Sequence, residues 1–288
     1  MSTAAVALDS RDQLGEGPFW DARHDELLRV DIARGRVHGW SPSTGSEWCR
    51  QHEGEVSAVV PRAGASGWLL AAGHRLLLDG DRAELLARVE VEQPGNRFND
   101  CKCDPQGRLW AGTMSKDRSP GAAALYRLTH GADIERVVAG TTISNGLAWS
   151  PSGDRMYFID SVTQRVDVFD FDARTGAVAD RRTFAEIDLA DGLPDGMTVD
   201  AEGGVWVCLF GGAAVRRYRD DGKLDAVFEL PVTNVTSAAF GGPGLRTLYL
   251  TSARQGLSER QLAAEPLAGA VLAIEPGVAG LPGNPFAG

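Results

Sequence analysis

The sequence predicts an all-β protein, a six-bladed β-propeller of four-stranded antiparallel sheets around a central channel. Three observations predict this fold. A unit recurs six times at a spacing of 40 to 50 residues, most of the 35 glycines stand in short turn-like clusters, and no segment shows a long helical period. Repeats of this length, built from several short strands, are typical of propellers. We therefore treat residues 1–288 as a single propeller domain.

Each repeat consists of a short apolar strand, a turn rich in Asp, Pro, Ser and Gly, and a second strand rich in Leu, Val, Trp and Tyr. The last apolar residue before each turn is the anchor of its repeat. The six anchors are Trp20, Val60, Cys103, Trp149, Val199 and Phe240. Alternating segments such as 165–172 and 214–220 follow the second strands and suit outer, half-exposed strands. A β-helix would need a shorter repeat, and a pair of β-sandwiches would need a domain break.

The two ends of the chain are expected to close the ring. An apolar run at 4–8 and a strand at 269–274 would share one blade, which leaves no open sheet edge. The segment 258–264, SERQLAA, is compatible with one short helical turn.

Composition and charge exclude several classes of partner. The net charge is −10 and the chain has no basic stripe, which disfavours binding to nucleic acid or to an anionic membrane surface. The first residues lack the basic and apolar regions of a secretory signal, and no stretch approaches the length of a membrane span. The four cysteines form neither a disulfide scaffold nor a zinc motif. We predict a cytoplasmic protein with no nucleic-acid, membrane or protein partner.

A second regularity appears four residues before each anchor. Because innermost strands line the channel of a propeller, these positions should face one another across the axis. The six residues there are Glu16, Val56, Asn99, Asn145, Asp195 and Thr236. Four of them carry carboxylate or amide oxygens, and three of those four are followed by glycine, which lets the chain bend or another group approach closely.

An acidic and amide-rich channel needs a counter-charge, because buried charges are usually paired or bound to metal. Neither of the two remaining equivalent positions holds Lys or Arg. Oxygen ligands without His or Cys suit a hard divalent cation, Ca²⁺ best, with Mg²⁺, Mn²⁺ or Zn²⁺ as alternatives. Asn-Gly and Pro-Asp-Gly are also common turn sequences, so each residue alone has a plain structural explanation. Their recurrence at one phase of the repeat favours the metal site.

Five stretches carry a resemblance to a known family: LGEGPFWD (14–21), PGNRFNDCKCDPQGRLWAGTM (94–114), ISNGLAWS (143–150), LPDGMTVDAEGGVWV (193–207) and GLPGNPFAG (280–288). With them the chain resembles the senescence marker protein/gluconolactonase/regucalcin family over nearly its whole length. The resemblance implies a six-bladed propeller, one divalent cation in the channel and hydrolysis of sugar lactones.

The same resemblance assigns roles to individual residues. It implies that the metal ligands are Glu16, Asn145 and Asp195 and that the substrate-binding residues are Arg97 and Asn99. The family pattern has a glutamate just after GTM, on a loop over the pocket. Here the aligned residue is Asp117, whose side chain is one methylene shorter. We predict that Asp117 takes part in substrate binding with a shorter reach.

These residue types suit lactone hydrolysis. A channel cation would supply Lewis acidity for the carbonyl group and for water, Asp195 would accept a proton, and Arg97 would stabilise the developing negative charge. The predicted reaction converts an aldonolactone to an aldonic acid, a step of carbohydrate metabolism. A serine nucleophile is disfavoured because no G-x-S-x-G elbow is present. Two alternatives stay open: a non-enzymatic calcium-binding regulatory propeller, and a hydrolase of another ester or phosphotriester.

Overall fold

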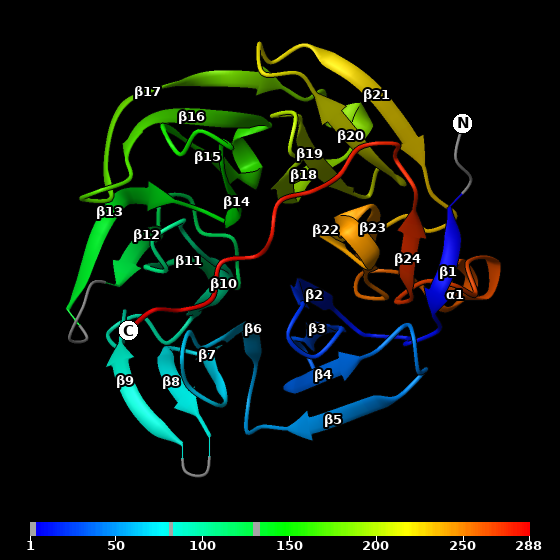
Figure 1. The fold of residues 1–288 in the computed structure, drawn as a ribbon, viewed down its shortest axis with the longest axis horizontal. Helices are drawn as coiled ribbons and strands as arrows, with labels where there is room; N and C mark the ends of the chain where they lie inside the picture. The colour runs from blue at the N-terminus through cyan, green and yellow to red at the C-terminus, as the bar shows by residue number, and fades with distance from the viewer. Residues whose placement is uncertain (1–3, 81–82, 129–132) are drawn as a thin grey trace.

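Six four-stranded antiparallel sheets form a ring in the computed structural model, which describes residues 4–80, 83–128 and 133–288 (Figure 1). The predicted six-bladed propeller is confirmed. One strand of each sheet lies next to the channel and contacts its counterparts in both neighbouring blades. These innermost strands are β2 (Gly15–Asp21), β6 (Val56–Pro61), β10 (Asn96–Cys103), β14 (Ser144–Trp149), β18 (Leu193–Val199) and β22 (Val235–Gly241). Each anchor lies on one of them.

The remaining strands follow outward in each blade. The second strands are β3 (Glu26–Asp31), β7 (Trp68–Ala72), β11 (Leu109–Ser115), β15 (Arg155–Asp160), β19 (Val205–Phe210) and β23 (Thr247–Ser252). The third strands are β4 (Arg36–Trp40), β8 (Arg75–Asp79), β12 (Ala123–Leu128), β16 (Arg165–Asp172), β20 (Ala214–Tyr218) and β24 (Val271–Ile274). The outermost strands are β1 (Ala5–Leu8), β5 (Glu47–Gln51), β9 (Glu84–Arg88), β13 (Ile134–Thr141), β17 (Ala177–Glu186) and β21 (Leu224–Glu229).

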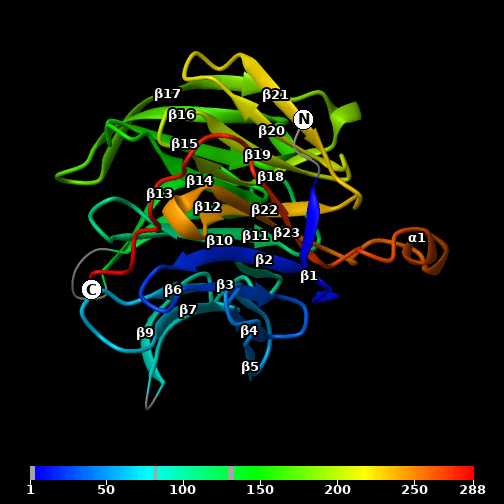
Figure 2. The ribbon, with the colours of Figure 1, turned by 45° about the vertical axis from the view of Figure 1, so that its right-hand side comes forward.

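Helical structure in the described residues is short. It comprises α1 (Glu259–Ala264) and the 3₁₀ turns η2 (Ser161–Thr163), η3 (Leu189–Asp191) and η4 (Pro243–Leu245). Helix α1 projects from the side of the ring and confirms the expected helical turn (Figure 2). A capping box between Ser258 and Gln261 satisfies its first backbone amides. None of these helices is long and apolar enough to cross a membrane.

The ring closes through one blade made from both ends of the chain. Strand β1 pairs antiparallel with β24, with Ala5 opposite Ala273 and Val6 opposite Leu272 (Figure 1). The expected closure is therefore confirmed. The pairing covers the edge of β24, and β1 becomes the outermost strand of this blade.

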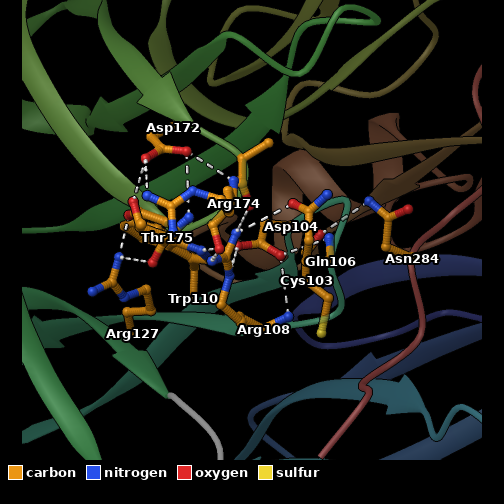
Figure 3. A network of polar contacts seen from close by, with 12 residues as sticks. Cys103, Asp104, Gln106, Arg108, Trp110, Arg127, Asp172, Arg174, Thr175 and Asn284 are labelled. Atoms are coloured by element: carbon orange, nitrogen blue, oxygen red, sulfur yellow. Dashed lines mark hydrogen bonds and ion pairs between the residues drawn. The ribbon is translucent and has the colours of Figure 1, made fainter.

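The anchors mark one end of the channel, which we call the rear end. There the turns after β10 and β18 are built on buried carboxylates. Asp104 accepts hydrogen bonds from Arg108 Nε (2.6 Å) and Trp110 Nε1 (3.1 Å), and Arg108 Nη2 donates to Ala173 O of the next blade (2.5 Å; Figure 3). Asp200 makes the matching contacts in the next blade but one, accepting from Trp206 Nε1 (2.8 Å) and Arg217 Nε (2.8 Å). Buried carboxylates with this many donors fix the turns and join blades.

The last ten residues, 279–288, cross the rear end as a tail, from the side of β24 to the opposite side of the ring (Figures 1 and 2). Its backbone bonds to several blades: Ala201 N donates to Ala279 O (2.9 Å), Phe286 N to Pro61 O (2.8 Å) and Ala287 N to Gly107 O (3.0 Å). The Phe286 side chain is buried in the core shared by the blades of β6 and β10. Beneath the tail, the rear ends of the innermost strands line a cavity of about 260 Å³.

Candidate metal and substrate site

The opposite end of the channel, called the front end, carries a β-bulge in every innermost strand. The pairing register shifts in all six, at or directly after the position four residues before the anchor. In β14 the shift lies between Ser144 and Leu147, and in β18 between Pro194 and Met197. Residues inside a bulge leave the regular ladder and their side chains are re-aimed. The bulges thus present the predicted site residues at the front end.

The glycines that follow three site residues have two different functions. Gly17 has φ +53°, a left-handed conformation that side chains rarely adopt. Gly146 and Gly196 instead permit close packing of neighbouring innermost strands. A Cβ on Gly146 would lie 2.7 Å from Asp195 O, and one on Gly196 would overlap Ser237. Both expectations for these glycines, bending and close approach, are therefore met.

Asn145 and Asp195 lie in direct contact across two blades. Asn145 Nδ2 donates to Asp195 Oδ1 and to Ser161 Oγ (3.1 Å), and Ser161 Oγ donates to Pro194 O (2.7 Å). These bonds fix the orientation of the Asn145 amide. Its Oδ1 is buried and has no hydrogen-bond partner in the described structure. A buried carbonyl oxygen without a donor is unfavourable, and it is available to a ligand.

The carboxyl groups of Glu16 and Asp195 both have raised pKa values. Burial, followed by the charge of Asp100, raises the pKa of Glu16 to about 8. Burial, followed by the charge of Glu16, raises the pKa of Asp195 well above its ordinary value. Neither carboxyl group makes an ion pair among the described residues. The structure thus brings Glu16 and Asp195 together as neighbouring carboxyl groups without an ion pair, and a divalent cation would relieve their repulsion.

Arg97 and Asn99 lie beside this pair on β10. Arg97 Nη1 donates to Phe98 O (2.7 Å) and to Asn99 Oδ1 (2.8 Å), and Asn99 Nδ2 donates to Ser144 O (3.0 Å). Burial lowers the pKa of Arg97, and the charges of Glu55, Glu16 and Asp195 oppose that shift. An arginine stays cationic in proteins, so it places a fixed positive charge next to the carboxyl groups.

The other two equivalent positions are structural. Val56 is wholly buried in the apolar core. Thr236 Oγ1 donates to Gly15 O (2.5 Å) and contacts Thr251 Oγ1 (2.8 Å), which ties β22 to β2. The ligand-type side chains therefore come from β10, β14 and β18, which are neighbours, and from β2, which β6 and β22 separate from them. The site is asymmetric within a pseudo-sixfold ring.

Two charged residues near the site, the buried Asp100 and the half-buried Lys102, were not predicted. Asp100 shares the bulge of β10 with Asn99, its Oδ2 has no hydrogen-bond partner, and burial raises its pKa. Lys102 Nζ donates to Met197 O (2.7 Å), and burial lowers its pKa. The sequence signal for Asp100 was the run of two consecutive polar residues, Asn99-Asp100. Regular strand alternation would send only one of them toward the channel, so the run alone does not place Asp100 in the site.

The mouth of the site carries a charged bridge that also escaped prediction. Glu55, directly before β6, lies with Oε1 3.5 Å from Arg97 Nε and Oε2 2.5 Å from Lys116 Nζ. Asp117, on the same loop as Lys116, accepts hydrogen bonds from the Ser115 hydroxyl and from Ser119 N (3.1 Å) and Oγ (2.8 Å). The part of Asp117 in substrate binding stays a prediction.

A further group of ligand-type side chains lies at the rear end. Single atoms of Asp21, His24 and Glu26 lie within 4.8 Å of one another. Both carboxylates already accept hydrogen bonds, however. Asp21 accepts from Arg23 Nε (2.9 Å) and Nη2 (2.9 Å), and Glu26 accepts from Trp48 Nε1 (2.9 Å). The front end, with its unpartnered oxygen and unpaired carboxyl groups, is the better candidate for a metal.

A comparison with known families decides the affiliation of the chain. The model of the SMP-30/Gluconolactonase/LRE-like region matches residues 14–254, which include the whole front-end site. The chain belongs to the SMP-30/gluconolactonase family. The predicted family resemblance is thereby confirmed.

Relatives across the SMP-30/gluconolactonase family match almost end to end. Regucalcin of Danio rerio is 38% identical over 287 residues, covering 98% of this chain and 97% of its own length. The putative sugar lactone lactonase YvrE of Bacillus subtilis is 34% identical over 288 residues, covering 99% of both chains. The solved structure of a calcium-binding protein, regucalcin, from Agrobacterium tumefaciens superimposes with a TM-score of 0.94 at 30% identity, covering 99% of this chain and 97% of that one.

Proposed function

We propose that the protein hydrolyses sugar (aldono-) lactones to aldonic acids with the help of one divalent cation. The observation that carries the proposal is the buried, unpartnered Asn145 Oδ1 beside two unpaired carboxyl groups, Glu16 and Asp195, with Arg97 next to them. The family supports it, because one relative is named a putative sugar lactone lactonase.

The residues present fit a hard divalent cation. Glu16, Asn145 and Asp195 would hold it through oxygen atoms, and Ca²⁺ suits such ligands best. A structure of a family member is described as a calcium-binding protein, which agrees with that choice. Oxygen ligands of this kind also accept Mg²⁺, Mn²⁺ and Zn²⁺. When bound, the cation supplies Lewis acidity for attack on a carbonyl group.

The protein groups supply the remaining chemistry. Asp195 accepts a proton from the attacking water as the water oxygen bonds to the lactone carbonyl carbon. The bond from that carbon to the ring oxygen then breaks, and the proton passes to the ring oxygen, which becomes a hydroxyl group. Arg97 is held in place by Phe98 O and Asn99 Oδ1, and its charge stabilises the negative oxygen that develops. Asn99 orients Arg97 and offers its amide to sugar hydroxyls.

A calcium-binding regulatory role is the second candidate, favoured by the names of the regucalcin relatives. The two functions differ in what Arg97 is for, since cation binding alone does not require a fixed guanidinium beside the ligands.

One experiment separates the candidates. The protein is stripped with EDTA, single cations are added back, and acid release is measured with a panel of five- and six-membered sugar lactones, simple esters and a phosphotriester. Acid release from sugar lactones that returns only with a cation supports the proposal. Tight Ca²⁺ binding without turnover of any compound supports the regulatory role, and turnover confined to esters or the phosphotriester contradicts both.

A further inference from the structure

The charged bridge at the mouth connects the inside of the site to its surface. The side chain of Arg97 is 6% exposed, that of Glu55 30% and that of Lys116 49%. Glu55 therefore lies between two positively charged side chains. The buried Arg97 guanidinium is 3.5 Å from its Oε1, and the more exposed Lys116 ammonium is 2.5 Å from its Oε2. The two flanking positive charges hold this carboxylate in place beside Arg97.

Asp117 occupies a different environment on the neighbouring loop. Its Oδ1 accepts from the Ser115 hydroxyl, Ser119 N and Ser119 Oγ, so the carboxylate closes its own turn. These hydrogen bonds lower the pKa of Asp117 and would have to break before it could turn to a ligand. Of the two acidic side chains, Glu55 is the one in contact with Arg97.

We propose that Glu55 is the residue that recognises substrate hydroxyl groups and selects polyhydroxylated lactones over lactones without hydroxyls. This inference rests on the proposed lactonase function. A carboxylate has about four acceptor positions, and one contact to each of two cations leaves acceptors free on Glu55. Neighbouring hydroxyls of a sugar both donate and accept hydrogen bonds. The pair Arg97 and Glu55, a donor beside an acceptor, matches that pattern.

The energetic consequence is selective. A hydrogen bond to an ionised acceptor is stronger than a neutral one, and a site built to bind a hydroxyl group discriminates against the analogue that lacks it. Glu55 does not contact Glu16, Asn145 or Asp195 among the described residues. Arg97, which it does contact, keeps its bonds to Phe98 O and Asn99 Oδ1 when Glu55 is changed, so the reacting centre should stay in place. Selectivity, rather than the intrinsic rate, should change.

The test compares two six-membered lactones, glucono-δ-lactone and δ-valerolactone, which has no hydroxyl groups. In Glu55→Gln, kcat/KM for glucono-δ-lactone should fall about 10- to 100-fold, the range of one charged hydrogen bond, while kcat/KM for δ-valerolactone stays within about twofold. The matched control is Glu53→Gln, which removes the same charge from an exposed side chain two residues away. It should change neither value.

Three outcomes would contradict the inference. Equal losses on both lactones would show that Glu55 only positions Arg97. An unchanged ratio in Glu55→Gln, together with a changed ratio in Asp117→Asn, would assign selection to Asp117. A wild-type protein that hydrolyses no lactone with any cation would overturn the proposed function itself, and the inference with it. Melting temperatures of all variants, measured alongside, separate these effects from unfolding.

Discussion

The two ends of the same six innermost strands use buried polar groups in opposite ways. At the rear end, Asp104 and Asp200 are saturated with donors from backbone, tryptophan and arginine. At the front end, Asn145 Oδ1 and Asp100 Oδ2 have no partner, and the carboxyl group of Glu16 has a raised pKa. Satisfied buried groups stabilise a fold, whereas unsatisfied ones cost free energy and are retained where they bind something. On the proposed function, the rear end serves stability and the front end serves binding.

The largest effect is expected from breaking the front end. Asp195→Asn removes the proposed proton acceptor and one cation ligand, so kcat on sugar lactones should fall by at least about 10²- to 10⁴-fold. The melting temperature of the cation-free protein should stay equal or rise, because the free-energy cost of burying this carboxyl group next to Glu16 is removed. Initial rates and thermal unfolding check both statements. A variant with kcat within threefold of the wild type would remove Asp195 from its catalytic role.

The converse pattern is expected at the rear end. Phe286→Ala empties a buried site of the tail and should lower the free energy of unfolding by about 3–5 kcal/mol. Turnover per folded molecule at low temperature should remain within twofold. Urea unfolding curves and kcat measure the two quantities. Leu189→Ala, at a side chain that is 70% exposed, is the control and should change neither. A large loss of kcat in Phe286→Ala would mean that the two ends are coupled.

Cation binding should sharpen the contrast in a pH-dependent way. A raised carboxyl pKa means that folding favours the neutral form of Glu16. Stability from this group is present below its ordinary pKa and is lost as pH rises through about 8. Ca²⁺ reverses that loss, with a stabilisation of about 2.7 kcal/mol at a hundredfold excess over Kd.

The rise in melting temperature on Ca²⁺ addition should therefore be larger at pH 9 than at pH 6. Differential scanning fluorimetry in Ca²⁺ and in EDTA measures it. Glu16→Gln should remove most of the difference between the two pH values. Equal Ca²⁺ shifts at both pH values would contradict the expectation.

The smallest effect is expected from a substitution that affects both stability and turnover. Gly146→Ala places a methyl group against Asp195 O and Met197 Cγ, an overpacking that costs about 1–3 kcal/mol. Because Asp195 must shift, kcat should fall as well, so this variant should lower both quantities moderately. Gly80→Ala, where an added methyl meets no atom within 4 Å, is the control. Chemical unfolding and steady-state kinetics record the result, and a variant that loses neither stability nor kcat would show that the strands can move apart.

The sequence predicted the ring because equivalent residues recur at the same positions within each repeat. Trp20 and Trp149 recur at equivalent points of their strands, and the ligand-type residues Glu16 and Asn145 stand four residues before them. Both patterns are properties of residue order alone. The closure of the ring followed from apolar segments at the two ends of the chain, since a propeller leaves only one place for them.

Site residues at other positions of the repeat could not be predicted. Asp100 lies in a bulge, so its side chain points in a direction that regular strand alternation would not give. The position of the bulge depends on how β10 pairs with β11. Glu55 stands one residue before an apolar equivalent position, Val56, so the repeat gave it no weight. Its importance depends on contacts with Arg97 and Lys116, from a different blade. Such contacts depend on loop conformation, which residue spacing does not encode.

The pairing of β1 with β24 also has a consequence for how the protein is made. A ribosome releases Ala5 long before Ala273, so the earliest strand must wait, unpaired, while five blades are synthesised. All three proposed cation ligands lie in blades that precede β22 along the chain. A truncated product lacking β24 would thus contain the complete ligand set and yet leave β1 and β23 without the strand that pairs with both. Unpaired strand edges promote aggregation, so the pairing of β24 determines whether the chain completes its fold or aggregates.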